Sequence, residues 1–277
     1  LPFGPVTYVV PRRRGGDGRR SLLLPVVCMQ TIAANLGSML TPIGNPQNLY
    51  LYGKSGMSIG GFVLLMLPYT LVSLLLLLAW AALVCRKASA ALSVDKLVSS
   101  SASRGNQKII LLYLVLFAVC LLSVIRVLPY GIAFAAVLLC ALFADPRTLR
   151  TVDYSLLLTF VAFFIFIGNL GRIPAFSGWL QEFLTGREVL VAVLASQVTS
   201  NVPAALLLSG FTAETQALII GTNLGGLGTL IASMASLISY RQIARELPQG
   251  KKQYFGLFTL SNLIFLAILL GVWFLLH

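Results

Sequence analysis

Two apolar stretches of the sequence carry the same pattern of asparagine, glycine and threonine. They are residues 34–49 and 222–237, and a shift of 188 residues superimposes them. Identity occurs at six positions, namely Asn35/Asn223, Leu36/Leu224, Gly37/Gly225, Thr41/Thr229, Ile43/Ile231 and Leu49/Leu237. Polar groups inside an apolar run are costly unless they have partners or a function. The repeated pattern therefore indicates two related parts of a functional site.

Each stretch predicts a helix that is interrupted within the apolar run. The first break, 41–46, reads Thr-Pro-Ile-Gly-Asn-Pro, and its prolines remove backbone donors and hold the break open. The second, 225–229, reads Gly-Gly-Leu-Gly-Thr, and glycine lets the backbone approach a ligand closely. At such breaks free N–H groups attract anions. Free carbonyls, together with Thr and Asn oxygens, suit a small hard cation such as Na⁺.

A third polar element interrupts the apolar run 188–211. Its sequence Ser200-Asn201-Val202-Pro203 predicts the tip of a re-entrant hairpin, which would bring hydroxyl and amide groups level with 225–229. The alternative is that these small and polar residues only pack helices together. Packing is the preferred interpretation for Ser209 and Ser233 taken alone.

The candidate set follows from these three elements. The predicted substrate- and ion-binding residues are Asn35, Gly37, Thr41, Pro42, Gly44, Asn45, Ser200, Asn201, Thr222, Asn223, Gly225, Gly228 and Thr229. Within it, the possible Na⁺ ligands are Asn35, Thr41, Ser200, Asn201 and Thr229.

The composition predicts an all-α polytopic membrane protein. Of 277 residues, 58% are hydrophobic and 10% are charged, and the mean hydropathy is +0.91. A soluble domain of this size could not bury so much apolar surface. Several apolar runs exceed the roughly 20 residues that cross a bilayer.

The net charge of +12 does not indicate a nucleic-acid partner, because the basic residues lie in short loops between apolar runs. The cysteines are interpreted as small buried hydrophobes, and the sole histidine is His277. The sequence contains no Ser/His/Asp set, no metal-ligand cluster and no phosphate-binding loop. The chain is therefore predicted not to be an enzyme, and no cofactor is expected.

The distribution of Lys and Arg predicts the orientation. If the loop 12–20 is cytoplasmic, 16 of the 20 basic residues lie on the inside, as the positive-inside rule requires. The two broken helices then cross in opposite directions, which is typical of an inverted repeat.

The resulting organisation has three parts. Residues 1–85 form the end of a first inverted repeat, with a hairpin remnant at 1–11, a broken helix and one further span. Residues 86–108 form a cytoplasmic linker, and 109–277 form the second repeat. The second repeat is expected to contain spans at 109–125, 130–144 and 154–171, an interfacial helix at 173–186, the hairpin, a broken helix at 213–240 and a span at 254–276. The first residue, Leu1, suggests a cut through a larger protein.

These motifs resemble the ion transporter superfamily, which includes divalent anion–sodium symporters, citrate transporters, arsenite permeases and Na⁺/H⁺ antiporters. The resemblance rests on the two broken-helix motifs and on Ser200-Asn201-Val202-Pro203, and it covers nearly the whole chain. It implies two inverted repeats with re-entrant hairpins, a homodimer and elevator-like movement. Symporters of the family carry Ser-Asn-Thr at the hairpin tip, whereas this chain has Val202 at the third position. The break at 41–46 is closer to the arsenite-permease and antiporter branch.

The leading functional hypothesis is secondary active transport of a small anion, such as citrate or a dicarboxylate, coupled to Na⁺ or H⁺. The alternatives are efflux of arsenite or a similar oxyanion, Na⁺/H⁺ antiport, and a passive channel. Antiport requires an ionisable group in the transport path, and the carboxylates of this chain lie at helix ends and in loops. The expected location is a bacterial inner membrane, with the lipid bilayer and a second copy of the chain as partners.

Overall fold

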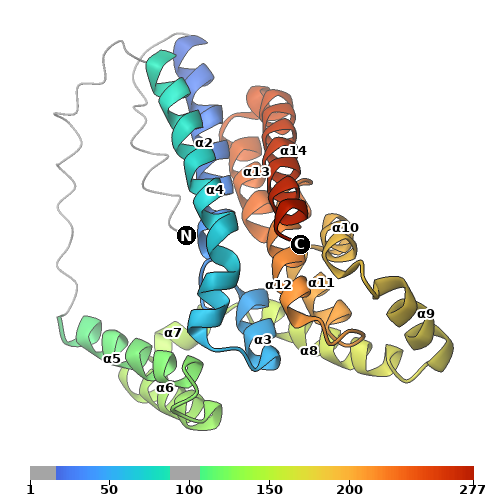
Figure 1. Ribbon diagram of the computed structural model, residues 1–277. Coiled ribbons are helices and arrows are strands. Elements are labelled where there is room, and N and C mark those ends of the chain that lie inside the picture. The colour runs from blue at the N-terminus through green and yellow to red at the C-terminus, as the bar shows by residue number, and fades with distance from the viewer. Residues whose placement is uncertain (1–16, 88–106) are drawn as a thin grey trace.

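The computed structural model describes residues 17–87 and 107–277, and these residues form helices without any strand (Figure 1). The helices are α2 (Asp17–Ser38), α3 (Pro46–Ser55), α4 (Ile59–Lys87), α5 (Gln107–Val124), α6 (Tyr130–Ala144), α7 (Pro146–Arg150), α8 (Tyr154–Leu170), α9 (Pro174–Leu184), α10 (Glu188–Thr199), α11 (Asn201–Leu208), α12 (Thr215–Leu224), α13 (Met234–Glu246), η2 (Pro248–Gly250) and α14 (Lys251–Leu276). The predicted hairpin remnant at 1–11 and most of the linker 86–108 lie outside the described residues.

The all-α membrane fold predicted from the composition is confirmed. Among the described helices, α4 and α14 are each long and apolar enough to cross a membrane, and the bent pair α8–α9 adds a third candidate span. The stretches predicted as spans are helical within a few residues, as α4, α5, α6, α8 and α14, but the apolar parts of α5 and α6 are shorter than a membrane span needs. Helix α2 begins at Asp17, so the predicted loop 12–20 is wrong for its last residues.

Two helices are broken where the sequence predicted it. The first runs as α2, stops at Ser38 and resumes as α3, and the second runs as α12, stops at Leu224 and resumes as α13. Figure 1 shows α2 and α3 descending while α12 and α13 ascend. Helix α13 packs beside α2, so the two broken helices are antiparallel neighbours.

The second half of each broken helix begins at a capping side chain. Asn45 accepts a hydrogen bond from the Asn48 N–H at 3.0 Å, and Pro46 then occupies the first helical turn of α3. Ser233 accepts one from the Ser236 N–H at 3.2 Å at the start of α13. Both residue types favour helix starts, and proline is tolerated there because the N–H that it lacks would have no intrahelical partner.

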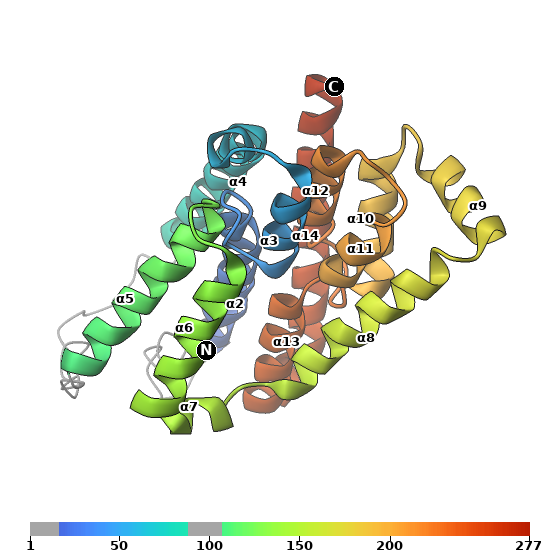
Figure 2. The same cartoon turned by 90° about the horizontal axis from the view of Figure 1, so that it is seen from below.

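The core lies between α2, α4, α10, α12 and α14, where the buried apolar side chains form one cluster. Helices α5 and α6 pack side by side, apart from α10 and α12 (Figure 2). Their apolar side chains are largely exposed, as in helices that face lipid or another subunit.

Helix α9 is bent by 100° from α8, at the position predicted for an interfacial helix. Trp179 and Phe183 stack with ring centroids 5.6 Å apart, and both are exposed. An amphipathic helix perpendicular to a span, with exposed Trp and Phe, suits the level of the lipid headgroups. Helix α9 leads directly into the hairpin formed by α10 and α11.

Asp145, between α6 and α7, ties these helices to α5. Its carboxylate accepts hydrogen bonds from the Tyr113 hydroxyl at 2.9 Å and the Thr148 hydroxyl at 2.8 Å. The Thr148 and Tyr113 hydrogen bonds hold the pKa of Asp145 below its ordinary value, since both donors favour the ionised form.

This contact predicts a pH-dependent difference in stability between wild type and Tyr113→Phe. A depressed carboxyl pKa stabilises the fold above the unfolded-state pKa of about 4, and the contribution is lost as pH falls through the folded-state value. Unfolding temperatures measured between pH 3 and pH 8 should therefore separate the two proteins at neutral pH and converge in acid. Tyr130→Phe serves as the control. A constant gap across this range would contradict a role for Asp145 ionisation.

Candidate functional site

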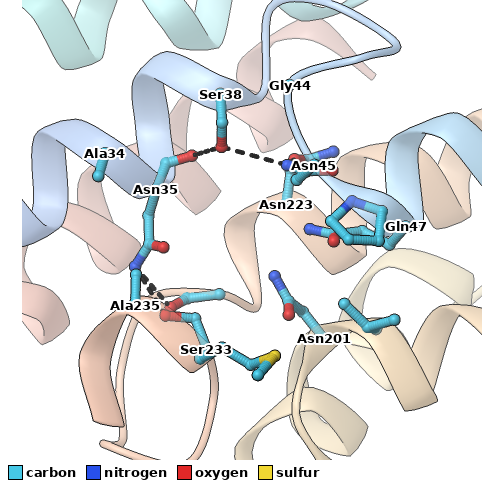
Figure 3. A pocket seen from close by; sticks show the side chains of 14 residues that line it. Ala34, Asn35, Ser38, Gly44, Asn45, Gln47, Asn201, Asn223, Ser233 and Ala235 are labelled. Atoms are coloured by element: carbon cyan, nitrogen blue, oxygen red, sulfur yellow. Dashed lines mark hydrogen bonds between the residues drawn. The ribbon is translucent and has the colours of Figure 1, made fainter. Parts of the chain in front are cut away.

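The two breaks and the hairpin tip line a half-open cavity of about 220 Å³ (Figure 3). Its lining residues are Ala34, Asn35, Ser38, Gly44, Asn45, Pro46, Gln47, Asn201, Val202, Asn223, Gly226, Ser233, Met234 and Ala235. None of these lining residues is ionisable, so the cavity presents side-chain amides, hydroxyls and apolar groups, without any full charge. The space is large enough to admit a small molecule.

Among the described helices, α3, α11 and α13 begin at the cavity. Their first residues Pro46, Asn201 and Met234 all belong to its lining. The first N–H groups of a helix have no intrahelical partner and carry the positive end of the helix dipole. Three such ends converging on one space create a positive potential without a charged side chain, which favours a bound anion.

Two hydrogen bonds join the broken helices reciprocally. The Asn35 amide donates to the Ser233 hydroxyl at 3.0 Å, and the Asn45 amide donates to the Asn223 side-chain oxygen at 3.1 Å. The shift of 188 that relates Asn35 to Asn223 also relates Asn45 to Ser233. Asn35 and Asn223, which the shift of 188 relates, thus each meet the capping residue of the other half, and the contacts have approximate twofold symmetry.

Asn223 and Asn48 complete the connection between the two breaks. The Asn223 amide donates to the Asn48 side-chain oxygen at 2.6 Å and to the Ile219 carbonyl at 2.7 Å. Asn48 in turn donates to the Met39 carbonyl at 3.3 Å, within the first break. These bonds satisfy buried amides and a free carbonyl in a region where unpaired groups are costly.

The hairpin tip is fixed to the second break. The Asn201 N–H donates to the Ala232 carbonyl at 3.0 Å. Ser200 adopts φ 76° and ψ 154°, a conformation that a residue with a side chain rarely holds unless its surroundings impose it. The tip therefore has a defined position relative to the cavity.

Two buried amides face the cavity without a partner. The side chains of Asn201 and Gln47 line it and are only 8% and 2% exposed, yet neither makes a hydrogen bond to any residue in the described ranges. Figure 3 shows both among the side chains that line the cavity. Both amides open onto the cavity, where they can bond to a molecule that enters it.

Small residues let the hairpin arm α10 approach α12. Gly221 lies on α12, and Gly225 follows the last residue of that helix, four positions later. Both face α10. An added Cβ on Gly221 would lie 2.7 Å from the Ala192 side chain, and one on Gly225 would lie 2.6 Å from the Ser196 hydroxyl. Such small-residue spacing is typical of close helix contacts in membranes.

The structure brings part of the predicted set together. The predicted residues that line the cavity are Asn35, Gly44, Asn45, Asn201 and Asn223. The predicted residues outside its lining are Gly37, Thr41, Pro42, Ser200, Thr222, Gly225, Gly228 and Thr229. Among them, Thr222 donates to the Leu218 carbonyl of its own helix at 2.7 Å, and the Thr229 hydroxyl donates to the Gln197 carbonyl at 3.0 Å.

Sequence reasoning missed several polar residues of this region. They are Ser38, Gln47, Asn48, Gln197 and Ser233, the last of which was interpreted as a packing residue. The shift of 188 pairs Ser233 with Asn45, and Gln197 lies three positions before the hairpin tip in an apolar run. These two signals could have identified Ser233 and Gln197.

Comparison with known proteins identifies the family. A family model described as citrate transporter matches residues 2–217. The chain belongs to the citrate transporter family. Inner membrane protein YbiR of Escherichia coli K12 is 34% identical over 222 residues, covering 78% of this chain and 58% of that protein. Uncharacterized transporter MJ0456 of Methanocaldococcus jannaschii is 32% identical over 216 residues, covering 78% and 57%.

The chain thus spans somewhat more than half the length of both relatives. No solved structure matches it. Membership of this family agrees with the membrane fold.

Proposed function

We propose that the protein is a secondary active transporter of a small anion, citrate or a similar carboxylate, coupled to Na⁺ or H⁺. The observation that carries this proposal is the convergence of the N-termini of α3, α11 and α13 on one cavity. The positive ends of these three helix dipoles suit carboxylate oxygens. The unpartnered amides of Asn201 and Gln47 would add donors for the same ligand.

The neutral lining supports weak, reversible binding of the anion, which transport requires, rather than tight binding. A carboxylate held by backbone dipoles and amides, without Arg or Lys, would bind weakly enough to be released on the other side of the membrane. A bound cation would offset part of its negative charge during the crossing. Carbonyls at the interrupted helix ends, with the predicted oxygens of Asn35, Thr41, Ser200, Asn201 and Thr229, are the proposed Na⁺ ligands.

The antiparallel broken helices and their reciprocal hydrogen bonds support an inverted-repeat transport domain. The exposed apolar faces of α5 and α6 support a separate scaffold, through which two copies would form a homodimer. Movement of the transport domain against this scaffold would be elevator-like. The inner-membrane relative of Escherichia coli supports the inner membrane of a bacterium as the location.

Arsenite efflux is the second candidate function. Arsenite is an uncharged trihydroxide at neutral pH, and the neutral amides and hydroxyls in the cavity lining can accept from and donate to its O–H groups. Na⁺/H⁺ antiport receives no support from this lining, because it includes no ionisable side chain.

Thermal unfolding of the full-length protein in detergent tests these alternatives. Citrate, succinate and arsenite are each added with Na⁺ or with choline at pH 5.5 and pH 7.5. A ligand at 100 times its Kd stabilises the folded state by about 2.7 kcal/mol, so the unfolding temperature should rise by a few degrees. We expect a rise with a carboxylate that depends on Na⁺ or on acid pH. A rise with arsenite alone would favour efflux, and a response to Na⁺ or pH without any anion would favour antiport.

A further inference from the structure

The second break leaves several backbone groups without helical partners. After Leu224 the chain passes through 225–233 before α13 begins. Within the hydrocarbon region water cannot satisfy such groups, and each unsatisfied N–H or C=O costs several kcal/mol. The break therefore needs hydrogen-bonding partners from another element.

One side-chain amide supplies several of these partners. The Gln197 Nε2 group, on the hairpin arm α10, donates to the Gly225 carbonyl at 3.0 Å and the Leu227 carbonyl at 2.9 Å. The Gln197 Oε1 atom accepts from the Thr229 N–H at 2.8 Å. A second link joins the main chain of α10, because the Thr229 hydroxyl donates to the Gln197 carbonyl at 3.0 Å.

The backbone of the break is shaped around this amide. Gly228 has φ 108°, a conformation that favours glycine, and a Cβ at this position would overlap the Gln197 amide. The chain from Gly225 to Thr229 thus curves closely around the Gln197 side chain, which takes the place of a peptide unit in the interrupted helix.

We propose that Gln197 is a positioning residue that holds the second break open in its binding-competent shape and couples it to the hairpin. The hairpin tip is the neighbour of this break, through Asn201 and Ala232. The Gln197 amide therefore fixes both the N-terminus of α11 and the chain that leads into α13, two of the helix starts at the cavity. The effect on transport rests on the function proposed above, whereas the effect on the break does not.

Only glutamine has the required groups at this distance. It combines one acceptor oxygen with two donor hydrogens at the end of its side chain. Methionine has similar length and volume but no such donors. Glutamate is nearly isosteric, and its ionised form would place a second acceptor against the Gly225 and Leu227 carbonyls. Protonation of that carboxyl would restore one donor.

Hydrogen–deuterium exchange of the full-length protein in detergent measures the shape of the break directly. For Gln197→Met we expect peptides covering 225–233 to exchange about tenfold faster or more, because the hydrogen bonds that oppose local opening of this segment are lost. Exchange of 39–45 should stay unchanged. Citrate uptake into proteoliposomes should fall in parallel. Gln242→Ala is the matched control, since Gln242 is half-buried on α13 and its side-chain amide donates to Glu246 of the same helix at 2.8 Å.

Gln197→Glu adds a pH readout that a general loss of packing would not produce. The facing carbonyls should raise the pKa of the new carboxyl above the ordinary value of about 4.3, so its protonated fraction grows from pH 8 to pH 5. The ratio of the variant's exchange rate at 225–233 to that of the wild type should fall toward 1 in acid. The ratio of the variant's uptake to that of the wild type should rise over the same pH change.

The outcomes separate the two proposals. Unchanged exchange at 225–233 in Gln197→Met, or a pH-independent ratio in Gln197→Glu, would overturn the positioning role. Faster exchange in the variants, with no citrate uptake even by wild type, would support the positioning role and refute the carboxylate substrate. If Gln197→Met does not accumulate in the membrane, the Gln197→Glu ratios decide alone.

Discussion

Replacing Asn223 by alanine is expected to abolish transport while leaving the protein inserted in the membrane. Asn223 is 4% exposed and joins Asn45 and Asn48 of the first break to its own helix α12. Its loss leaves the buried Asn48 side-chain oxygen without this donor, at about 1–3 kcal/mol, and removes one of the two acceptors of the half-buried Asn45 amide. These losses at the centre of the site should lower uptake by at least about tenfold, since 1.4 kcal/mol is one factor of ten. Labelled-citrate uptake into proteoliposomes measures this directly.

Asn262→Ala is the matched control for Asn223→Ala. Asn262 is another fully buried asparagine, on α14 and outside the cavity lining. Its amide donates to the Phe258 carbonyl of its own helix at 2.8 Å, and its side-chain oxygen has no partner among the described residues. Transport should therefore survive this change. Equal activity of the two variants would refute the role assigned to the contacts between the breaks.

Asn201→Ala should also remove transport, for a different reason. The Asn201 side chain makes no hydrogen bond to the described residues, so its removal costs the empty protein little. Its expected partner is the anion, and a hydrogen bond to a charged group contributes about 1.5–3 kcal/mol. The variant should keep the wild-type unfolding temperature without ligand but lose the rise that the anion produces. Uptake should fall by about tenfold to 100-fold.

The pair of measurements distinguishes ligand contact from structural support. Asn223→Ala should lower the unfolding temperature even without ligand, because its bonds connect the two broken helices. Asn201→Ala should not. If Asn201→Ala instead retained the full stabilisation by citrate and wild-type uptake, the hairpin tip would not contact the substrate.

Much of the architecture could be predicted from local sequence. Apolar length predicts α4, α5, α6, α8 and α14, because crossing a bilayer demands a long run without charges. The prolines and glycines at 41–46 and 225–229 predict the two breaks, since a continuous helix tolerates neither a missing donor nor a glycine cluster well. The shift of 188 also predicted that Asn35 and Asn223 are related, and both line the cavity.

The partners of these residues could not be predicted in the same way. Thr41 and Thr229 are identical in the sequence pattern, yet the Thr229 hydroxyl binds the Gln197 main chain and neither threonine lines the cavity. Gln197 belongs to none of the motifs in the sequence, although its side-chain amide forms hydrogen bonds to the backbone of Gly225, Leu227 and Thr229.

The sequence by itself determined the membrane class, the helices and the positions of the breaks, because these depend on the composition and backbone chemistry of short segments. The tertiary structure decided which polar groups meet. Asn35 pairs with Ser233, and Asn45 with Asn223, across separations of 198 and 178 residues. Such pairs form only after antiparallel helices pack at a particular rotation and depth, which small residues such as Gly221 allow. No local sequence pattern specifies that rotation. The cavity, with the N-termini of three helices around it, forms only when the helices have packed at that rotation.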